Sequence, residues 1–226
     1  MREPALRSIY TMLRNEFGFL DWWPGDTKLE VVVGAVLTQQ TSWKNVEKAI
    51  GSIKAANAMN LEKLAGMRLP KLESLIRSSG FYRQKARRLK GLLASILEYG
   101  GIENFFSADA EELRKRLLEM NGIGKETADS IILYAAEKPV FVVDAYTKRI
   151  LSRVYGIDEN ISYDELKGTI EHSIGRNLEL YKDFHAQFVE LGKRYCKTKP
   201  LCPDCPLAKS CKYSLKLAMG KTRGAR

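Results

Sequence analysis

Asp144 stands between a short apolar run, Val140–Val143, and a segment whose pattern predicts a helix over residues 145–154. The ordinary role of an aspartate in this position is to cap the helix N-terminus. A carboxylate fixed there could also stabilise positive charge that develops in a substrate, or orient or deprotonate an attacking water. The two roles are compatible, so Asp144 is the candidate catalytic residue.

A glycine-rich turn lies ahead of Asp144 in the sequence. Gly122 and Gly124 predict a tight turn between two helices, which residues with a Cβ would make only with strain. The N–H groups that open the next helix form an anion site, and Lys125 adds a positive charge. We expect Gly122, Gly124, Lys125 and Thr127 to bind a nucleic-acid phosphate. An ordinary helical hairpin with glycine at its turn is the alternative.

The four cysteines follow the pattern C-x5-C-x2-C-x5-C, at Cys196, Cys202, Cys205 and Cys211. Four thiolates so close together suit a tetrahedral metal ion or an iron–sulfur cluster. Spacing alone does not separate structural zinc from a [4Fe–4S] cluster. A disulfide framework is not expected, because charged residues at Arg2, Glu3 and Arg7 leave no room for a signal peptide.

Aromatic and apolar segments must position these groups. Trp22 and Trp23 lie in a predicted loop before Pro24, and such rings either fill a core or stack on a base that has left the DNA helix. The run 29–37 is β-branched, which suits a strand, but the pattern continues into 45–50 and favours a buried helix. Helices are also expected over 4–18, 107–120 with Ser107 as N-cap, and 178–195. In the last of these, His185 is expected to be a core residue.

The overall composition favours a polyanionic partner. The net charge is +10 and the isoelectric point is about 9.4. The sequence is 45% hydrophobic and 28% charged, which excludes a disordered chain. No stretch approaches a transmembrane helix in length and apolarity, so we expect no membrane partner and a cytoplasmic, nucleoid-associated protein.

The pattern L-x-x-x-x-G-I-G-x-x-T-A followed by V-V-D resembles the helix-hairpin-helix DNA glycosylase superfamily, which contains endonuclease III. The resemblance implies an all-α fold of two helical lobes with a DNA-binding cleft. Residues 27–135 would form the central lobe, and residues 1–26 with 136–226 the second. It also implies a [4Fe–4S] cluster in the loop 196–211, although the first cysteine gap is one residue shorter than in the family. Zinc remains the alternative. The invariant aspartate maps onto Asp144, and a monomer on double-stranded DNA is expected.

One branch, the endonuclease III-like 3-methyladenine DNA glycosylases, shares motifs at residues 22–24, 34–39, 79–86 and 122–129. The resemblance implies a damaged base sandwiched between Trp23 (or Trp22) and Trp43. It implies that Gln40, or alternatively Gln39, fills the gap left in the DNA. It aligns Lys193 with a buried lysine that could pair with Glu126. The G-F-Y-x-x-K-A signature at residues 80–86 is expected mainly to pack.

Bifunctional members of the superfamily carry a lysine where this chain has Glu126, and Lys125 is one residue early. We therefore predict a monofunctional base-excision-repair glycosylase for alkylated purines such as 3-methyladenine, without efficient strand cleavage. One alternative is an endonuclease III-like glycosylase and lyase for oxidised pyrimidines or mismatched bases. Another is a DNA-binding module that performs no catalysis.

Overall fold

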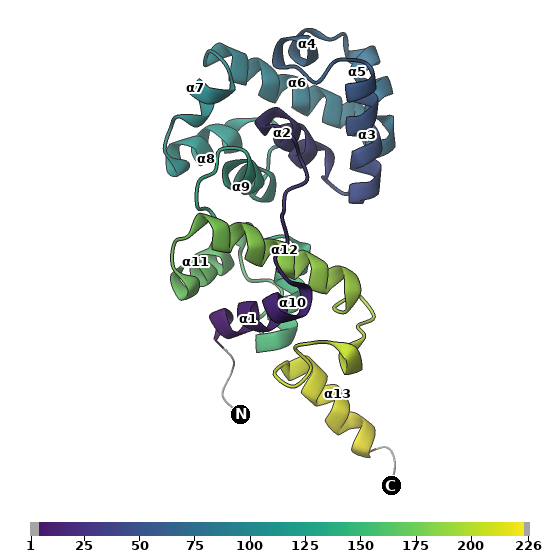
Figure 1. The fold of residues 1–226 in the computed structure, drawn as a ribbon, viewed down its shortest axis with the longest axis vertical. Helices are drawn as coiled ribbons and strands as arrows, with labels where there is room; N and C mark the ends of the chain where they lie inside the picture. Colours follow the sequence, from purple (N-terminus) through teal and green to yellow (C-terminus); the bar gives the residue numbers. More distant parts are fainter. Residues whose placement is uncertain (1–4, 224–226) are drawn as a thin grey trace. The chain divides into compact units, whose positions relative to one another are not determined.

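The computed structural model describes residues 5–223 and consists of helices joined by loops (Figure 1). No strand occurs within this described part, so the predicted all-α class is confirmed. The chain separates into two compact units: Trp23–Pro139, and the flanking segments that end at Trp22 and resume at Val140. The predicted domain division at residues 27 and 135 stays a prediction. Its outermost residues, 1–4 and 224–226, lie outside the described residues.

The Trp23–Pro139 unit is built around α2 (Lys28–Leu37), in which every residue from 29 to 37 is buried. Helix α2 packs against α3, α6 and α9, which explains why this run is apolar on all sides. The prediction of a buried helix is therefore confirmed. The other elements are α3 (Trp43–Ala55), α4 (Leu61–Gly66), α5 (Leu69–Leu75), η1 (Arg77–Ser79), α6 (Tyr82–Glu98), α7 (Ile102–Phe106), α8 (Ala110–Glu119) and α9 (Lys125–Tyr134).

Side-chain caps fix where these helices begin. The Thr27 hydroxyl accepts a hydrogen bond from the Glu30 N–H at 3.2 Å and starts α2. The carboxylate of Asp109 accepts hydrogen bonds from two N–H groups at 2.9 Å and starts α8. The predicted start at Ser107 is wrong, because that hydroxyl donates to the Asn104 carbonyl and ends α7 instead.

The second unit contains α1 (Leu6–Phe17), α10 (Ala145–Tyr155), α11 (Tyr163–Ile174), α12 (Leu178–Arg194), η2 (Cys202–Asp204) and α13 (Lys212–Arg223). Helix α12 contacts α1 and α10 and carries much of the core, including the stacked rings of Phe184 and Phe188. The apolar segment 140–143 is buried and has no regular secondary structure.

Asp183, which is 1% exposed on α12, fixes the loop that leads to the tryptophans. Its carboxylate accepts hydrogen bonds from the Tyr10 hydroxyl at 2.7 Å and the Leu20 N–H at 3.0 Å. Arg14 compensates its charge at 3.3 Å. Burial, together with the hydrogen bond to Asp183 and its charge, raises the pKa of Tyr10 to about 12. The Tyr10 hydroxyl therefore remains a donor at neutral pH.

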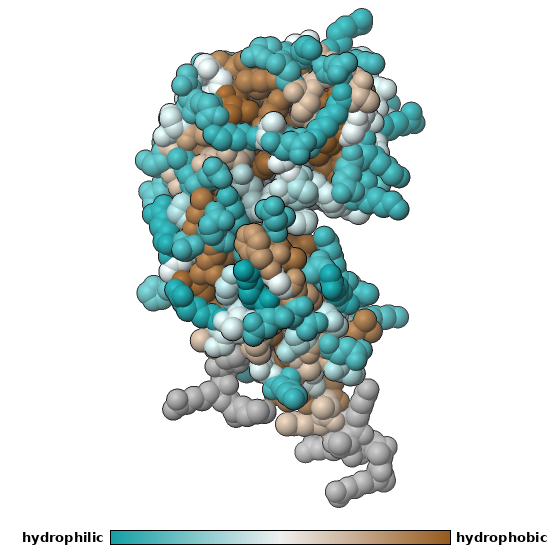
Figure 2. All heavy atoms as spheres, viewed as in Figure 1, coloured by the Kyte–Doolittle hydropathy of each residue, from teal (hydrophilic) through white to brown (hydrophobic). Residues whose placement is uncertain are grey.

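Hydrophilic residues cover most of the visible surface, and apolar side chains show between them only in patches (Figure 2). Among the helices of residues 5–223, none has the combination of length and apolarity that crossing a membrane requires.

Candidate functional site

The predicted hairpin is formed by α8, a turn at residues 120–124, and α9. Gly122 has φ of +79°, and a Cβ there would lie 2.1 Å from Arg88 Nε, so only glycine fits. Gly124 differs: its φ is −89° and a Cβ would meet nothing within 4 Å. The expectation of backbone strain at Gly124 was therefore wrong, because its extended backbone is open to any residue.

The start of α9 faces solvent. Gly124 is its N-cap and has no side chain to cap the helix, and Lys125 and Glu126 are exposed. Thr127 is buried, unlike its neighbours, so its side chain does not belong to the exposed surface. Arg114 and Asp129 join α8 to α9 through two hydrogen bonds of 2.7 and 3.3 Å. The hairpin is thus a rigid element that presents a helix N-terminus.

Gln39 ties the loop after α2 to this hairpin. Its Nε2 donates hydrogen bonds to the Gly122 carbonyl and to the Thr127 hydroxyl, each at 3.0 Å. Its Oε1 accepts a hydrogen bond from Arg88 Nη1 at 2.7 Å. No local pattern predicts this link, because the partners are distant along the chain. It leaves Gln40 as the exposed member of the pair, with φ of +53°.

A second exposed side chain stands at the start of α6. Phe81 is 61% exposed with φ of +45°, although the signature that contains it was expected mainly to pack. The packing expectation holds for Lys85, which is 1% exposed and donates from Nζ to the Leu37 carbonyl at 2.8 Å and the Ser79 carbonyl at 2.6 Å. Burial, helped by the charge of Arg88, lowers the pKa of Lys85 to about 8.

Three aromatic rings of the Trp23–Pro139 unit form a cluster. Trp23 contacts Trp43 edge to face, with ring centroids 5.3 Å apart and planes at 88°, and it also contacts Tyr134. Gly34 makes room for the cluster, since a Cβ there would lie 3.2 Å from Trp23 Nε1. The predicted sandwich of Trp23 and Trp43 is not present in this arrangement, because the two rings touch instead of facing each other in parallel.

Trp22 belongs to the other unit and carries a cation on its face. The Lys193 ammonium lies 5.0 Å from the centroid of the Trp22 ring. Lys193 is exposed, whereas the resemblance implied a buried lysine, so that expectation was wrong. Its suggested pairing with Glu126 stays a prediction. The contact shows that the Trp22 face is electron-rich and accessible to a positive charge.

Asp144 caps α10, as its position in the sequence predicted. Its Oδ1 accepts a hydrogen bond from the Thr147 N–H at 2.7 Å, and its side chain remains 12% exposed. Its Oδ2 lies 3.6 Å from Nε2 of the buried His185 on α12. Burial by itself raises the pKa of Asp144, but His185 and the hydrogen bonds from Thr147 outweigh it and lower the pKa below its ordinary value. The carboxylate is therefore held ionised.

His185 was expected to be only a core residue, and its contact with Asp144 was missed. The two residues lie on different helices, and α10 and α12 approach closely where Gly192 faces Tyr146. A Cβ at Gly192 would lie 2.1 Å from the Tyr146 ring. Gly192 and His185 are both buried on α12. A glycine on the same helix as the histidine was the signal in the sequence for a close approach by another helix.

The cysteines lie around η2 and the start of α13, and none is in a disulfide. Arg153 Nη1 donates to Cys196 Sγ at 3.3 Å, and Cys211 Sγ donates to the Arg153 carbonyl at 3.4 Å. Burial raises the pKa of Cys205 to about 11, and the charges of the other three sulfurs act in the same direction. Within residues 5–223 no three potential ligands meet the geometry of a single-ion site. Four cysteine thiols outside any disulfide are the donor set that an iron–sulfur cluster uses.

Comparison with known proteins places these features in context. The family model of the HhH-GPD superfamily base excision DNA repair proteins matches residues 33–175. A proposed DNA repair glycosylase of Methanocaldococcus jannaschii is 48% identical over 206 residues, which cover 90% of this chain and 94% of that protein.

Two solved structures have similar folds. The H. pylori 3-methyladenine DNA glycosylase bound to 1,N6-ethenoadenine has a TM-score of 0.74 and 35% identity, and the match covers 82% of this chain and 96% of that one. An endonuclease III in a non-covalent DNA complex has a TM-score of 0.80 over 95% of this chain and 97% of its own. At 24% identity, this second likeness shows the fold alone.

Proposed function

The chain belongs to the HhH-GPD superfamily of base excision DNA repair proteins, and we propose that it is a monofunctional glycosylase for alkylated purines. It is a DNA glycosylase, an enzyme that cleaves N-glycosyl bonds, so the resemblance deduced from its motifs is confirmed. The choice of alkylated purine and the absence of strand cleavage are the parts that we propose.

The observation that carries the proposal is the ionised carboxylate of Asp144. Breaking an N-glycosidic bond builds positive charge on the sugar, at C1′ and the ring oxygen. A fixed carboxylate stabilises that charge without having to reorganise during the reaction. Thr147 and His185 hold the carboxylate in place and lower its pKa, so it carries its negative charge at neutral pH.

In the proposed reaction the C1′–N bond breaks and its electron pair leaves with the base. The oxygen of a water molecule forms the new bond to C1′, and its proton passes to Asp144 or to solvent. A purine alkylated on a ring nitrogen carries a positive charge and leaves as a neutral base. It therefore needs little help from an acid, which agrees with a site whose candidate catalytic residue is a carboxylate.

The proposal of a monofunctional enzyme is supported by the start of α9. Strand cleavage through an imine needs an amine at the position that Glu126 occupies, and this exposed carboxylate cannot form one. Lys125 is the first residue of α9, and one residue corresponds to about 100° around a helix. We therefore expect Lys125 to contact phosphate and not the sugar carbon.

The preference for an alkylated purine is supported by the electron-rich indoles. Trp22 already holds the Lys193 ammonium on its face, so it has the electronic character that favours a cationic base. The likeness to a 3-methyladenine glycosylase points in the same direction. Because the Trp23 and Trp43 rings now touch, stacking on Trp23 would require one of the two rings to turn.

We further propose that Cys196, Cys202, Cys205 and Cys211 hold a [4Fe–4S] cluster rather than zinc. The Arg153 N–H that points at Cys196 Sγ would stabilise a thiolate ligand. A bound cluster would supply structural support to the loop. The double-stranded DNA partner follows from the proposed activity, as does a place at the nucleoid, and a monomer stays a prediction.

The experiment that tests the proposal identifies the released base. Duplexes carrying methylated purines, an oxidised pyrimidine or a G·T mismatch are incubated with the protein, and products are separated by chromatography, with borohydride added to parallel samples. Release of 3-methyladenine without a trapped covalent complex is expected. Release of the oxidised pyrimidine or thymine with a trapped complex would favour the alternative and point to Lys125. Binding without any release would leave only a DNA-binding module.

A further inference from the structure

A hollow of about 440 Å³ lies between α6 and the turn that begins the hairpin. Five of its lining residues, one of them the buried Leu92, share one face of α6, because they recur at helical spacing. The turn contributes two residues that directly precede Gly122. The lining residues that matter here are Gln84, Arg87, Arg88, Gly91, Met120 and Asn121.

The lining of this hollow is positively charged. It contains two guanidinium groups and two side-chain amides, and no carboxylate. Arg88 is fixed by its hydrogen bond to Gln39 Oε1 and by packing against Gly122. The Arg87 guanidinium is exposed and makes no hydrogen bond or ion pair with any residue in the described range 5–223. Its planar fork can therefore donate two parallel hydrogen bonds to two oxygens of an anion such as phosphate.

We propose that this hollow is a second phosphate site, which binds a DNA backbone phosphate next to the one held at the hairpin. Arg87 supplies the charge, and the amides of Asn121 and Gln84 supply further donors. This inference rests on the proposed function, because it takes DNA as the ligand. The two sites are contiguous, since Asn121 of the hollow is followed directly by Gly122 of the hairpin.

A backbone phosphate suits the hollow better than a free phosphate compound. Four of its seven lining residues are exposed, and none of the seven has an aromatic ring that could stack on the base of a free nucleotide. A strand already bound at the hairpin would bring its neighbouring phosphate to the hollow at high effective concentration. A soluble ligand would lack that advantage.

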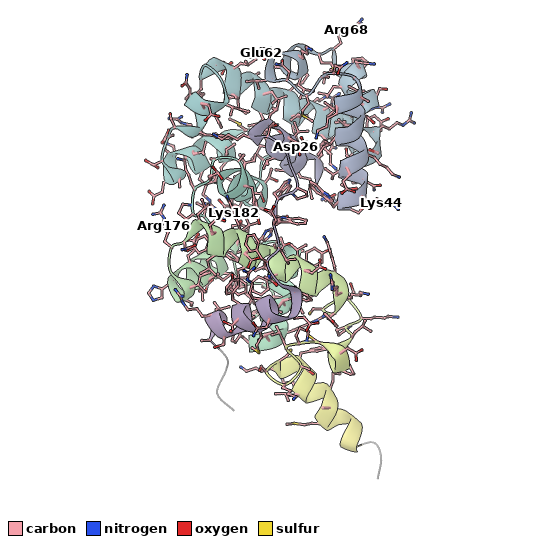
Figure 3. All side chains as sticks on the ribbon, in the orientation of Figure 1. Asp26, Lys44, Glu62, Arg68, Arg176 and Lys182 are labelled. Atoms are coloured by element: carbon pink, nitrogen blue, oxygen red, sulfur yellow. The ribbon has the colours of Figure 1, made fainter. Side chains whose placement is uncertain are left out.

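Two variants test the site from different directions. Arg87→Gln removes the charge, and Gly91→Leu fills the hollow, since a Cβ at Gly91 meets nothing within 4 Å. Leucine is also the better helix former, so the fold of Gly91→Leu should be kept. The matched control is Arg68→Gln, which removes an exposed arginine at the start of α5, in the part of the unit near α4 (Figure 3).

Binding to an undamaged duplex is measured by fluorescence anisotropy over a range of salt concentrations. For Arg87→Gln we expect the slope of log K against log salt to fall by about 1, as for the loss of one phosphate contact. Gly91→Leu should bind several-fold more weakly while its melting temperature stays the same or rises. Arg68→Gln should behave as wild type. Wild-type binding and slope in both Arg87→Gln and Gly91→Leu would overturn the proposal.

Neutral methylphosphonate linkages, moved one position at a time along the strand, locate the contact. Wild type should bind more weakly when the linkage next to the hairpin phosphate is neutral. The same neutral linkage should not weaken binding by Arg87→Gln any further. If the loss of affinity caused by Arg87→Gln added to the loss caused by the neutral linkage at every position, the proposal would be overturned. So would saturable binding of inorganic pyrophosphate that Gly91→Leu abolishes without changing DNA affinity. Because undamaged duplex is used, failure here is separate from failure to release a base.

Discussion

Nε2 of Gln39 lies 3.0 Å from the backbone oxygen of Gly122 and donates a hydrogen bond to it. This bond joins the loop after α2 to the turn of the hairpin. Arg88, which donates to the other end of the same amide, fixes the orientation of Gln39. The phosphate site proposed at the hairpin and the loop that carries the exposed Gln40 are therefore held together rigidly.

Gln39 and Gln40 should differ sharply when each is replaced. Gln39→Ala leaves the Gly122 carbonyl and the Arg88 guanidinium without a partner, at a cost of about 1–3 kcal/mol of unfolding free energy. Gln40→Gly removes a side chain from a left-handed backbone, so stability should be unchanged or about 1 kcal/mol higher. Chemical denaturation measures both.

Base release from damaged duplex completes this comparison. Gln40→Gly should slow release or weaken binding although its fold is intact, because nothing then fills the gap in the DNA. If Gln40→Gly released bases at the wild-type rate, Gln40 would not have the proposed role.

The two hairpin glycines offer a second contrast. Gly122→Ala places a Cβ against Arg88 on a backbone with positive φ, so we expect a large loss of stability, about 2 kcal/mol or more. Gly124→Ala fits the backbone and meets no protein atom, so its melting temperature should match wild type. Its DNA affinity should nevertheless fall, because the methyl group occupies the surface where phosphate would bind. Unchanged DNA affinity in Gly124→Ala would argue against a phosphate at this N-terminus.

His185 should control the acid limit of activity through Asp144. His185 lowers the pKa of Asp144, so His185→Asn, which removes that influence while burial remains, raises that pKa. The carboxylate then gains a proton at higher pH, and the acid limb of the rate of base release moves to higher pH. An acid limb that stays in place, in single-turnover measurements from pH 3.5 to 7, would show that His185 only packs.

The same shift has a consequence for stability. The pKa of Asp144 in the folded protein is below its ordinary value of 3.8. Its contribution to stability is therefore present above pH 3.8 and is lost as the pH falls through the folded-state pKa. His185→Asn should make acid unfolding begin at higher pH.

Lys85 should make the free energy of unfolding increase as the pH becomes more alkaline. Its pKa in the folded protein is about 8, below the ordinary 10.5. Between these two pH values the unfolded chain therefore binds more protons than the folded protein does. The free energy of unfolding should therefore rise from pH 8 to 10.5 through this group. Lys85→Met should be less stable and lack this rise in melting temperature. Lys90→Met, on the same helix, should keep it. A rise that persisted in Lys85→Met would assign the effect to another group.

Local patterns were enough to predict some parts of this structure. The helix over 29–37 and the cap at Asp144 both depend on neighbours in sequence. The sequence contains two possible N-cap residues before α8. Asp109 caps the helix with two hydrogen bonds, and Ser107 does not.

Contacts between distant segments could not be predicted in this way. Gln39 meets Gly122 and Arg88, and Asp144 meets His185, only because the packing of helices brings them together. The mutual contact of Trp23 and Trp43 likewise depends on the room that Gly34 leaves on α2. For these residues the sequence supplied candidates, and the fold decided their partners.

The most direct test of the central claim compares wild type with Asp144→Asn on DNA that contains 3-methyladenine. Asparagine keeps the shape of the side chain and its ability to cap α10, but it removes the charge. We predict that single-turnover release of 3-methyladenine falls by about 100-fold or more while affinity for the duplex is kept. Release at the wild-type rate by Asp144→Asn would contradict the assignment of Asp144 as the catalytic carboxylate.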